Sequence, residues 1–263
     1  MPSSFTFKVM SVTDSSNRRV YLGFALRGLI YSLLKRRTPL LAERLHELKR
    51  LAPFSLSPLT PEHEDRPTLT SIKASRVYTF RLNALTEELT RVVVEDLLGF
   101  DPPIMELQGS RMVVAEIQVH SFSYQSMLDE AKPIDSFKVD FKAPTFFRRS
   151  LRPDCCRGCP LDRRSCPLLK AARRRSMRYV CYPDPYLMFR GLARLWKAFS
   201  PARFNYQRYV EWLKKGGIVV AGIPRLRTVR VYEHPTTPKW SVGFIGTVYF
   251  SLPEDTYDPE MAK

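Results

Sequence analysis

The sequence has few of the residues on which many catalytic and membrane functions depend. It contains four histidines, and its 26 acidic residues are outnumbered by 42 basic ones. It has no His-Glu-x-x-His segment, no Walker loop and no cluster of acidic ligands, which disfavours metal-dependent phosphodiester cleavage. No apolar run approaches the ~18 residues of a membrane span, and the N-terminus lacks the pattern of a secretion signal. We therefore expect a cytoplasmic protein.

Asparagine and glutamine are also scarce, with three and four residues in 263, as is typical of thermophilic proteins. The excess of basic residues gives a net charge of +16 and a pI near 9.9. Arginine dominates, with 29 residues against 13 lysines, and its planar guanidinium grips phosphate better than an ammonium does. A pI above ~9 favours a nucleic-acid-binding protein over an ordinary basic enzyme.

The positive charge is concentrated between Arg148 and Arg178. Eleven basic and two acidic residues give this segment a net charge of +9. It includes the neighbouring arginines Arg148-Arg149 and Arg173-Arg174. A run of charge is often only a solvated tail, but this one is internal and ends at an apolar, strand-like stretch. We therefore expect it to form a surface that faces phosphate groups.

The same segment holds four of the five cysteines: Cys155, Cys156, Cys159 and Cys166. The pair Cys156-x-x-Cys159 has the spacing of a zinc knuckle, and four thiolates would close such a site against catalytic water. The second Cys-x-x-Cys pair is missing, so a disulfide and free thiols stay as alternatives. We expect a structural zinc at most, and no cofactor for catalysis.

Hydrophobic periodicity predicts two successive series of strands and helices. The first has strands at 5–12, 71–82 and 111–122, helices at 21–36, 38–50 and 86–98, and a proline-rich loop at 51–67. The second has strands at 136–141, 178–182, 218–221, 227–232 and 242–252, and helices at 186–199 and 205–215. This order predicts an α+β protein with two tandem ferredoxin-like (RRM-like) domains, whose antiparallel sheets have helices packed on one face.

We place the domain boundary near residue 130. The N-terminal domain then spans 1–130, and the C-terminal domain spans 131–263. The basic, cysteine-rich segment at about 150–176 is an insertion in the second domain, and 239–247 is a glycine-containing loop. No low-complexity repeat is visible in the sequence itself, and a structural duplication of one module in the two halves stays open.

His46 is the best candidate for acid–base chemistry. Metal-free RNA cleavage needs a base for the 2′-hydroxyl, an acid for the 5′-oxygen and cations for the phosphate. With Thr38 as N-cap, a helical wheel of 38–50 puts its leucines on the core face. It puts His46 on the opposite side with Ala42, Lys49 and Arg50, an arrangement that suits a phosphate site. The alternative is an ordinary exposed histidine.

Tyr31 lies at the flank of the preceding helix, near Arg27 and Lys35 at positions i−4 and i+4. Its hydroxyl could bond a phosphate or the attacking hydroxyl. A half-buried tyrosine that only packs against the core is the alternative.

Two features of the second half suit contact with an RNA backbone. Arg190, Arg194 and Lys197 form one basic stripe along a helix, which a merely solvated face would also show. Farther on, Lys239 precedes Gly243-x-x-Gly246, and glycines allow close approach of the backbone to a phosphate. The same glycine spacing also occurs in plain turns.

Taken in order, short stretches of the chain resemble the CRISPR repeat-processing endoribonucleases of the RAMP superfamily. The resemblance rests on the segments 28–31, 41–47, 53–59, 143–149, 182–185, 190–196 and 243–246, whose sequences are GLIY, LAERLHE, PFSLSPL, APTFFRR, YPDP, RGLARLW and GFIG. Together they span nearly the whole chain. The resemblance implies tandem ferredoxin-like domains and a CRISPR precursor RNA as substrate.

The family also implies metal-independent cleavage by the 2′-hydroxyl, which leaves a 2′,3′-cyclic phosphate and a 5′-hydroxyl. Tyr31 and His46 fall on two positions of a Tyr-His-Lys triad, whereas the lysine position is Ala52, so that Lys49 or Arg50 would replace it. The expected RNA-binding residues are Arg27, Arg148, Arg149, Arg173, Arg174, Arg190, Arg194, Lys239, Gly243 and Gly246.

Two other functions fit the same sequence. One is a non-catalytic RNA-binding subunit of a CRISPR effector complex, which the missing lysine favours. The other is a zinc-stapled nucleic-acid-binding protein without a link to CRISPR. In each case we expect a monomer or homodimer that binds no membrane.

Overall fold

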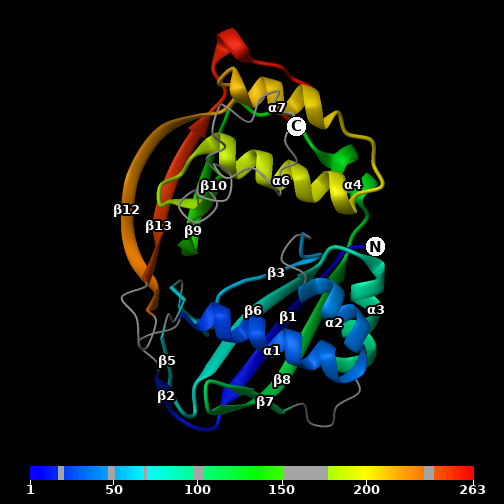
Figure 1. Cartoon of the computed structure of the whole chain (residues 1–263), viewed down its shortest axis with the longest axis vertical. Helices are drawn as coiled ribbons and strands as arrows, with labels where there is room; N and C mark the ends of the chain where they lie inside the picture. The colour runs from blue at the N-terminus through cyan, green and yellow to red at the C-terminus, as the bar shows by residue number, and fades with distance from the viewer. Residues whose placement is uncertain are drawn as a thin grey trace, which may run out of the picture.

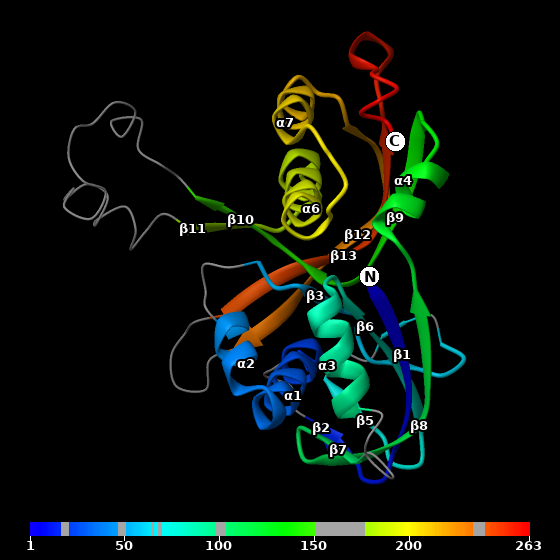
Figure 2. The same cartoon turned by 90° about the vertical axis from the view of Figure 1, so that its right-hand side faces the viewer.

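The computed structural model describes residues 1–16, 21–46, 51–64, 66–67, 70–97, 104–150, 177–233 and 240–263. The chain forms two lobes that are stacked along the long axis of the molecule, the N-terminal half below and the C-terminal half above (Figure 1). In each lobe the main helices pack on the same side of a sheet (Figure 2). Within the described residues, no helix is long and apolar enough to cross a membrane.

The N-terminal lobe is built on one antiparallel sheet with the strand order β3-β6-β1-β8-β7. Its main elements are β1 (Ser3–Ser11), α1 (Leu22–Arg37), α2 (Pro39–His46), β3 (Phe54–Leu56), β6 (Val77–Ala84), α3 (Glu87–Leu97), β7 (Ile104–Leu107) and β8 (Ser110–Ser121). The short β4 (Thr60–Pro61) pairs with β6, and β2 (Ser15–Ser16) pairs with β5 (Ser71–Ile72). The first strand lies in the centre, between the strands that precede and follow α3, as in a ferredoxin-like domain.

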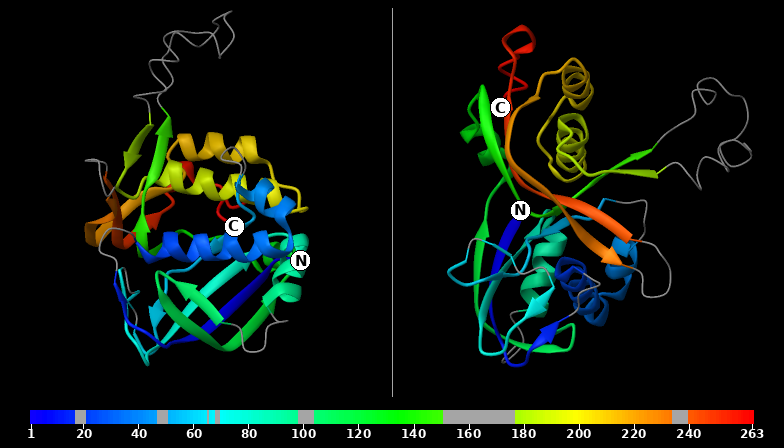
Figure 3. Two further views of the ribbon diagram at one scale, coloured as in Figure 1. Left: turned by 60° about the horizontal axis from the view of Figure 1, so that its bottom comes forward. Right: turned by 90° about the vertical axis from the view of Figure 1, so that its left-hand side faces the viewer.

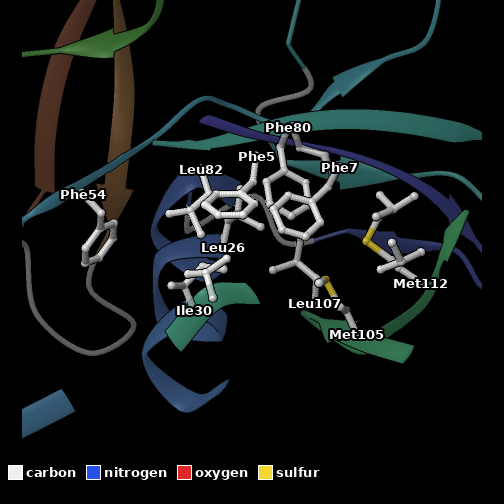
Figure 4. Packing of buried hydrophobic residues seen from close by; sticks show 14 of the residues in the cluster. Phe5, Phe7, Leu26, Ile30, Phe54, Phe80, Leu82, Met105, Leu107 and Met112 are labelled. Carbon is white, nitrogen blue, oxygen red and sulfur yellow. The ribbon is translucent and has the colours of Figure 1, made fainter. Parts of the chain in front are cut away.

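Alternation of apolar and polar residues explains how this sheet meets its helices. Phe5, Phe7 and Val9 of β1 are buried, and the ring of Phe7 stacks on that of Phe80 with centroids 4.7 Å apart. From α1, the buried residues Leu22, Leu26, Ile30 and Leu34 recur every four positions and complete the core (Figure 4).

The C-terminal lobe follows α4 (Tyr124–Glu130) and contains a three-stranded antiparallel sheet of order β12-β13-β9. Its elements are β9 (Ser136–Thr145), β10 (Phe147–Ser150), β11 (Met177–Val180), α6 (Pro185–Phe199), α7 (Tyr206–Lys214), β12 (Val219–Glu233), β13 (Trp240–Ser251) and the 3-10 turn η2 (Glu254–Thr256). The strands β10 and β11 pair with each other as a separate hairpin.

Side-chain caps fix where the helices of this lobe begin. The carboxylate of Asp184 accepts a hydrogen bond from the backbone N–H of Leu187 (2.9 Å), and Pro185 occupies the first helical position of α6. The Asn205 side chain caps α7 in the same way, accepting from the N–H of Arg208 (3.1 Å). Phe189 of α6 then packs on Phe250 of β13, with centroids 5.4 Å apart.

The predicted α+β class with tandem antiparallel sheets is confirmed, and several predicted boundaries are wrong. The expected loop at 51–67 contains the strands β3 and β4, and the strands predicted at 218–221 and 227–232 are one continuous strand, β12. Both β7 and α4 are additional elements. The domain boundary near residue 130 stays a prediction; α4 ends there, and β9 begins at Ser136.

The two lobes contact each other through a long hairpin and an aromatic pair. The hairpin β12–β13 reaches down to the N-terminal lobe (Figure 3), where the N–H of Tyr21 donates to the carbonyl of Val231 (3.0 Å). Burial raises the pKa of the Tyr21 hydroxyl to about 12. On the other side, Tyr124 meets Trp196 edge-to-face (centroids 5.2 Å apart) and donates its hydroxyl to the carbonyl of Leu85 (2.8 Å).

Candidate nucleic-acid interface

The predicted site residues Arg27 and Tyr31 are in contact on α1. The guanidinium of Arg27 donates to the hydroxyl oxygen of Tyr31 (3.2 Å) and lies 5.5 Å from the centre of its ring. Phe54 meets Tyr31 edge-to-face at 5.6 Å and lies 6.0 Å from the same guanidinium. Figure 4 shows Phe54 at the edge of the packed core. Tyr31 is half-buried, so it both packs against the core and meets an exposed cation.

The helix that carries His46 is described from Pro39 to His46, and the rest of the predicted helix at 38–50 lies outside the described residues. The side chain of His46 and the residues Lys49 and Arg50 also lie outside the described part. Ala42 is 5% exposed and belongs to the core. The predicted position of Ala42 on the solvent side is therefore wrong, whereas the predicted side of His46, Lys49 and Arg50 stays a prediction.

Thr38 directly precedes α2, as predicted for its N-cap, but its side chain bonds to the preceding helix. Its hydroxyl donates a hydrogen bond to the carbonyl of Leu34 (3.1 Å), in the last turn of α1. Its backbone carbonyl accepts a hydrogen bond from the N–H of Ala42 (3.0 Å), in the first turn of α2. Ala52, at the position of the family lysine, is partly buried against the same core. The orientation of α2 is thus set by the end of α1.

The basic stripe on α6 faces solvent, and its contact with RNA stays a prediction. Arg190, Arg194 and Lys197 are all exposed. Arg190 lies over the ring of Tyr186 at 5.6 Å, and Lys197 over that of Tyr206 at 5.1 Å. Arg194 borders a cavity of about 360 Å³, whose other lining residues are Leu51, Phe141, Thr145, Phe147, Leu187, Met188, Gly191, Leu192 and Leu195. This cavity joins the segment after α2 to the C-terminal lobe.

Gly243 and Gly246 lie within strand β13 and not in a loop, contrary to the prediction of a glycine loop at 239–247. A Cβ on Gly243 would lie 2.9 Å from the backbone of Thr145, and one on Gly246 would lie 2.1 Å from the carbonyl oxygen of Arg225. Gly246 also has φ +146°, which L side chains rarely adopt. The close approach of neighbouring strands therefore explains both glycines.

A second cavity, of about 690 Å³, lies where the C-terminal sheet meets the N-terminal lobe. It is lined by Arg66, Pro67, Asp140, Phe141, Lys142, Arg225, Arg227, Ile245, Gly246 and Thr247. Four of these side chains are cationic and one is acidic. The excess of positive charge suits an anionic ligand such as an RNA backbone. We call this the junction cavity.

The one carboxylate of the junction cavity is held in place by hydrogen bonds. Asp140 accepts a bond from the Thr247 hydroxyl (2.7 Å) and pairs with Lys138 (3.2 Å). The bond from Thr247, and then the one from Lys138, lower the pKa of Asp140. The carboxylate is therefore ionised at neutral pH and acts only as an acceptor.

Sequence reasoning missed Arg66, Lys142, Arg225 and Arg227. A signal was present, because Lys138, Asp140 and Lys142 alternate with apolar residues along β9, and Arg225-x-Arg227 shows the same period of two. The predicted interface was based on runs of neighbouring arginines. The charged residues of one strand face are two positions apart in the sequence, so they form no such run.

Other predicted residues lie outside the described part of the chain: Arg173, Arg174, Lys239, Cys155, Cys156, Cys159 and Cys166. Arg148 and Arg149 belong to β10, but their side chains are not described. The fifth cysteine, Cys181, is a free thiol 3.3 Å from the carbonyl of Val242. No group of three or more His, Cys, Asp or Glu residues in the described ranges could hold a metal ion. The zinc and disulfide alternatives stay predictions.

The fold is similar to solved structures along nearly the entire chain. A Cas6 product complex has a TM-score of 0.72 and 23% identity, covering 99% of this chain and 90% of that one. Thermus thermophilus Cas6 has a TM-score of 0.59 and 22% identity, covering 100% and 86%. A RAMP protein described as binding different RNA substrates has a TM-score of 0.53 and 10% identity, covering 97% and 90%.

No protein-family model matches the sequence, and no curated protein sequence does. At these identities the similarity is one of fold, shared over both lobes. The chain therefore has the two-domain fold of the Cas6 and RAMP proteins.

Proposed function

We propose that this protein is a metal-independent endoribonuclease that cleaves CRISPR precursor RNA within its repeats. The observation that carries the proposal is the cationic junction cavity, in a fold shared over its full length with a Cas6 product complex. The net charge of +16 and the exposed basic stripe on α6 support a long, polyanionic substrate.

The proposed reaction is an intramolecular displacement at phosphorus. The 2′-oxygen attacks the adjacent phosphorus as its proton passes to a base, and the bond from phosphorus to the 5′-oxygen breaks as that oxygen gains a proton. The products are a 2′,3′-cyclic phosphate and a 5′-hydroxyl. In the proposal His46 takes part in proton transfer, Tyr31 orients the reacting groups, and Lys49 or Arg50 stabilises the phosphorane charge.

Arg27 extends this assignment. Since its guanidinium donates to the Tyr31 oxygen and lies over the ring, it holds the tyrosine in one orientation and places a positive charge beside it. A cation at that distance would also attract the phosphate that Tyr31 contacts.

A non-catalytic RNA-binding subunit of a CRISPR complex is the second candidate. It is favoured by Ala52, which occupies the position of the family lysine and packs against the core. Such a protein would bind repeat RNA with similar affinity and leave it intact.

The test is cleavage of end-labelled repeat RNA in excess EDTA, beside an RNA with a 2′-deoxy nucleotide at the cut. We expect cleavage of the first RNA and none of the second. Cleavage that EDTA abolishes would contradict metal independence, and tight binding without cleavage in either buffer would establish the non-catalytic candidate.

The role of His46 is tested by His46→Asn, with His63→Asn as the matched control. His63 has a 90% exposed side chain and φ +65°, a conformation that asparagine tolerates. Loss of the catalytic proton transfer is expected to slow single-turnover cleavage by about 10²- to 10⁴-fold with unchanged RNA affinity. Equal rates in the two variants would remove His46 from the mechanism.

A further inference from the structure

The face of the C-terminal sheet opposite its helices combines exposed cations with an exposed aromatic ring. On β9 the apolar residues Phe137, Val139 and Phe141 point to the core, so Lys138, Asp140 and Lys142 point the other way. Strand register puts Thr247 opposite Asp140 and Tyr249 opposite Lys138. On β12, Arg225 is opposite Thr247, and Arg227 is opposite Ile245. We call this set of side chains the basic sheet face.

Tyr249 is the aromatic residue of this face. It is 47% exposed, whereas its neighbours in sequence, Val248 and Phe250, are completely buried. The residue paired with it on β12 is Gly222, and a Cβ there would lie 3.9 Å from the Tyr249 ring. The ring therefore lies across a position without a side chain, and core packing does not explain why this site is aromatic.

The charged residues around Tyr249 lie at increasing distances from its ring. Lys138 is its direct cross-strand partner, and Asp140 is its diagonal neighbour, within reach of an aromatic side chain. Beyond these lie the cations of the junction cavity, Lys142, Arg225 and Arg227, with Arg66 contributed by the N-terminal lobe. A ligand on this face would meet a stacking ring, then a hydrogen-bond acceptor, then a group of cations.

A single-stranded nucleic acid has the matching features. Its bases offer flat rings and N–H donors, and its phosphates offer negative charge. A double helix keeps its bases stacked internally and could use only the cations. A carboxylate is a poor neighbour for phosphate but accepts from the amino group of a base, which explains an ionised Asp140 among four cations.

We propose that the basic sheet face binds an unpaired stretch of RNA, with one base stacked on Tyr249, a base amino group directed at Asp140 and backbone phosphates held by Arg225, Arg227, Lys142 and Arg66. The inference rests on the proposed function for its RNA substrate and adds that part of the substrate must be unpaired. It assigns the recognition of that part to the C-terminal sheet.

The test is fluorescence anisotropy with a labelled 12-nucleotide single-stranded RNA and with a blunt RNA duplex of the same sequence. Loss of one base–aromatic stack is expected to weaken single-strand binding by Tyr249→Ala about 5- to 150-fold, with little change for the duplex. Tyr249→Phe keeps the ring and is expected to bind as the unmodified protein does. Tyr257→Ala removes another exposed tyrosine (41%) and is the matched control.

Base recognition is tested with oligo(A), oligo(C) and oligo(U). Uracil lacks the exocyclic amine, so we expect it to bind less tightly than the other two and Asp140→Asn to reduce the difference. A Tyr249→Ala variant that binds single strands like the control would overturn the proposal. Weaker binding of oligo(U) that Asp140→Asn leaves unchanged would overturn the role of Asp140.

A measurement on the unmodified protein covers the case in which Tyr249→Ala disturbs the strand. RNA that contains 4-thiouridine is cross-linked by light, and the attached peptide is identified. We expect adducts within 240–251, and adducts confined to other segments would contradict the proposal. Cleavage of repeat RNA is measured separately. If the protein cuts repeat RNA but its RNA binding does not depend on Tyr249, the proposed function stands and this inference fails. If RNA binding depends on Tyr249 but no RNA is cut, only the RNA-binding role of the basic sheet face stands.

Discussion

The two sheets bury aromatic residues in the same way and differ on their opposite faces. In the N-terminal sheet, Lys8 lies opposite Glu116 and pairs with Glu62 (2.5 Å), a bond that lowers the pKa of Glu62. Thr6 continues this face between Gln118 of β8 and the exposed Arg81 of β6, so that the two cations Lys8 and Arg81 are matched by the two carboxylates Glu62 and Glu116. The C-terminal sheet instead carries several cations around one carboxylate. The charges on this face of the N-terminal sheet are thus compensated within the protein. The corresponding face of the C-terminal sheet has an excess of positive charge that an anionic ligand would compensate.

The backbones differ as well. The N-terminal strands pair with one register shift between β1 and β8, whereas β12 and β13 have three shifts and include tightly packed glycines. Bulges increase local twist, which lets the hairpin β12–β13 bend toward the start of α1. The comparison suggests a division of labour in which the N-terminal lobe fixes Tyr31 and the C-terminal lobe presents the charge.

Core substitutions are the strongest way to break this comparison. Phe7→Ala and Phe250→Ala each remove a completely buried ring, at an expected cost of about 3–5 kcal/mol. If the lobes are separate stability units, each change lowers amide protection only in its own sheet. Native-state hydrogen exchange measures this directly. Equal loss of protection in both sheets after either substitution would show one cooperative unit.

A second, smaller effect concerns Gly246, one of the two tightly packed glycines in β13. Gly246→Ala introduces a Cβ close to the Arg225 carbonyl at a positive φ, so we expect it to destabilise the protein by about 1–3 kcal/mol. Gly191→Ala is the control, because its Cβ meets nothing within 4 Å on a helix, and alanine is expected to stabilise by about 0.5–1 kcal/mol there. Thermal unfolding separates the two. Equal stability of the variants would mean that the strands can move apart without cost.

The smallest effect is the acid dependence of Asp140. Because its pKa is lowered in the folded protein, its contribution to stability is complete above the ordinary pKa of 3.8 and is lost as the pH falls through the lower folded value. Asp140→Asn is expected to flatten this part of the stability curve and to lower stability at neutral pH by the same amount, which is small because the group is exposed. Urea unfolding between pH 2 and pH 5 measures it, and identical acid profiles would show that Thr247 and Lys138 do not hold the carboxylate in solution.

The fold was largely predictable from the sequence because its helices and long strands are strongly periodic. The start of α6 was predictable because Asp184 is a typical N-cap residue and Pro185 is typical of the first helical position. The errors occur where tertiary contacts overrode local signals. β3 forms in a proline-rich segment because it pairs with β6, and Ala42 is buried because α2 is oriented by the end of α1.

The candidate site was predictable only in part. Arg27 and Tyr31 are four residues apart on one helix, so their contact follows from helical geometry. The junction cavity joins residues from β9, β12, β13 and the loop before β5, and such a set follows only from strand register. The glycines were assigned to a loop because nothing in Gly-x-x-Gly reveals how closely a neighbouring strand approaches.

The junction at Thr38 has a consequence for how the chain can change in length. One residue closes α1 through Leu34 and opens α2 through Ala42, so no spacer separates the helices. Inserting a single residue there would turn α2 by about 100° and shift it by about 1.5 Å. Ala42 would leave the core, and position 46 would rotate with it. Unlike a surface loop, this helix pair is therefore expected to tolerate neither an insertion nor a deletion at Thr38. Insertions and deletions would then be confined to other parts of the protein.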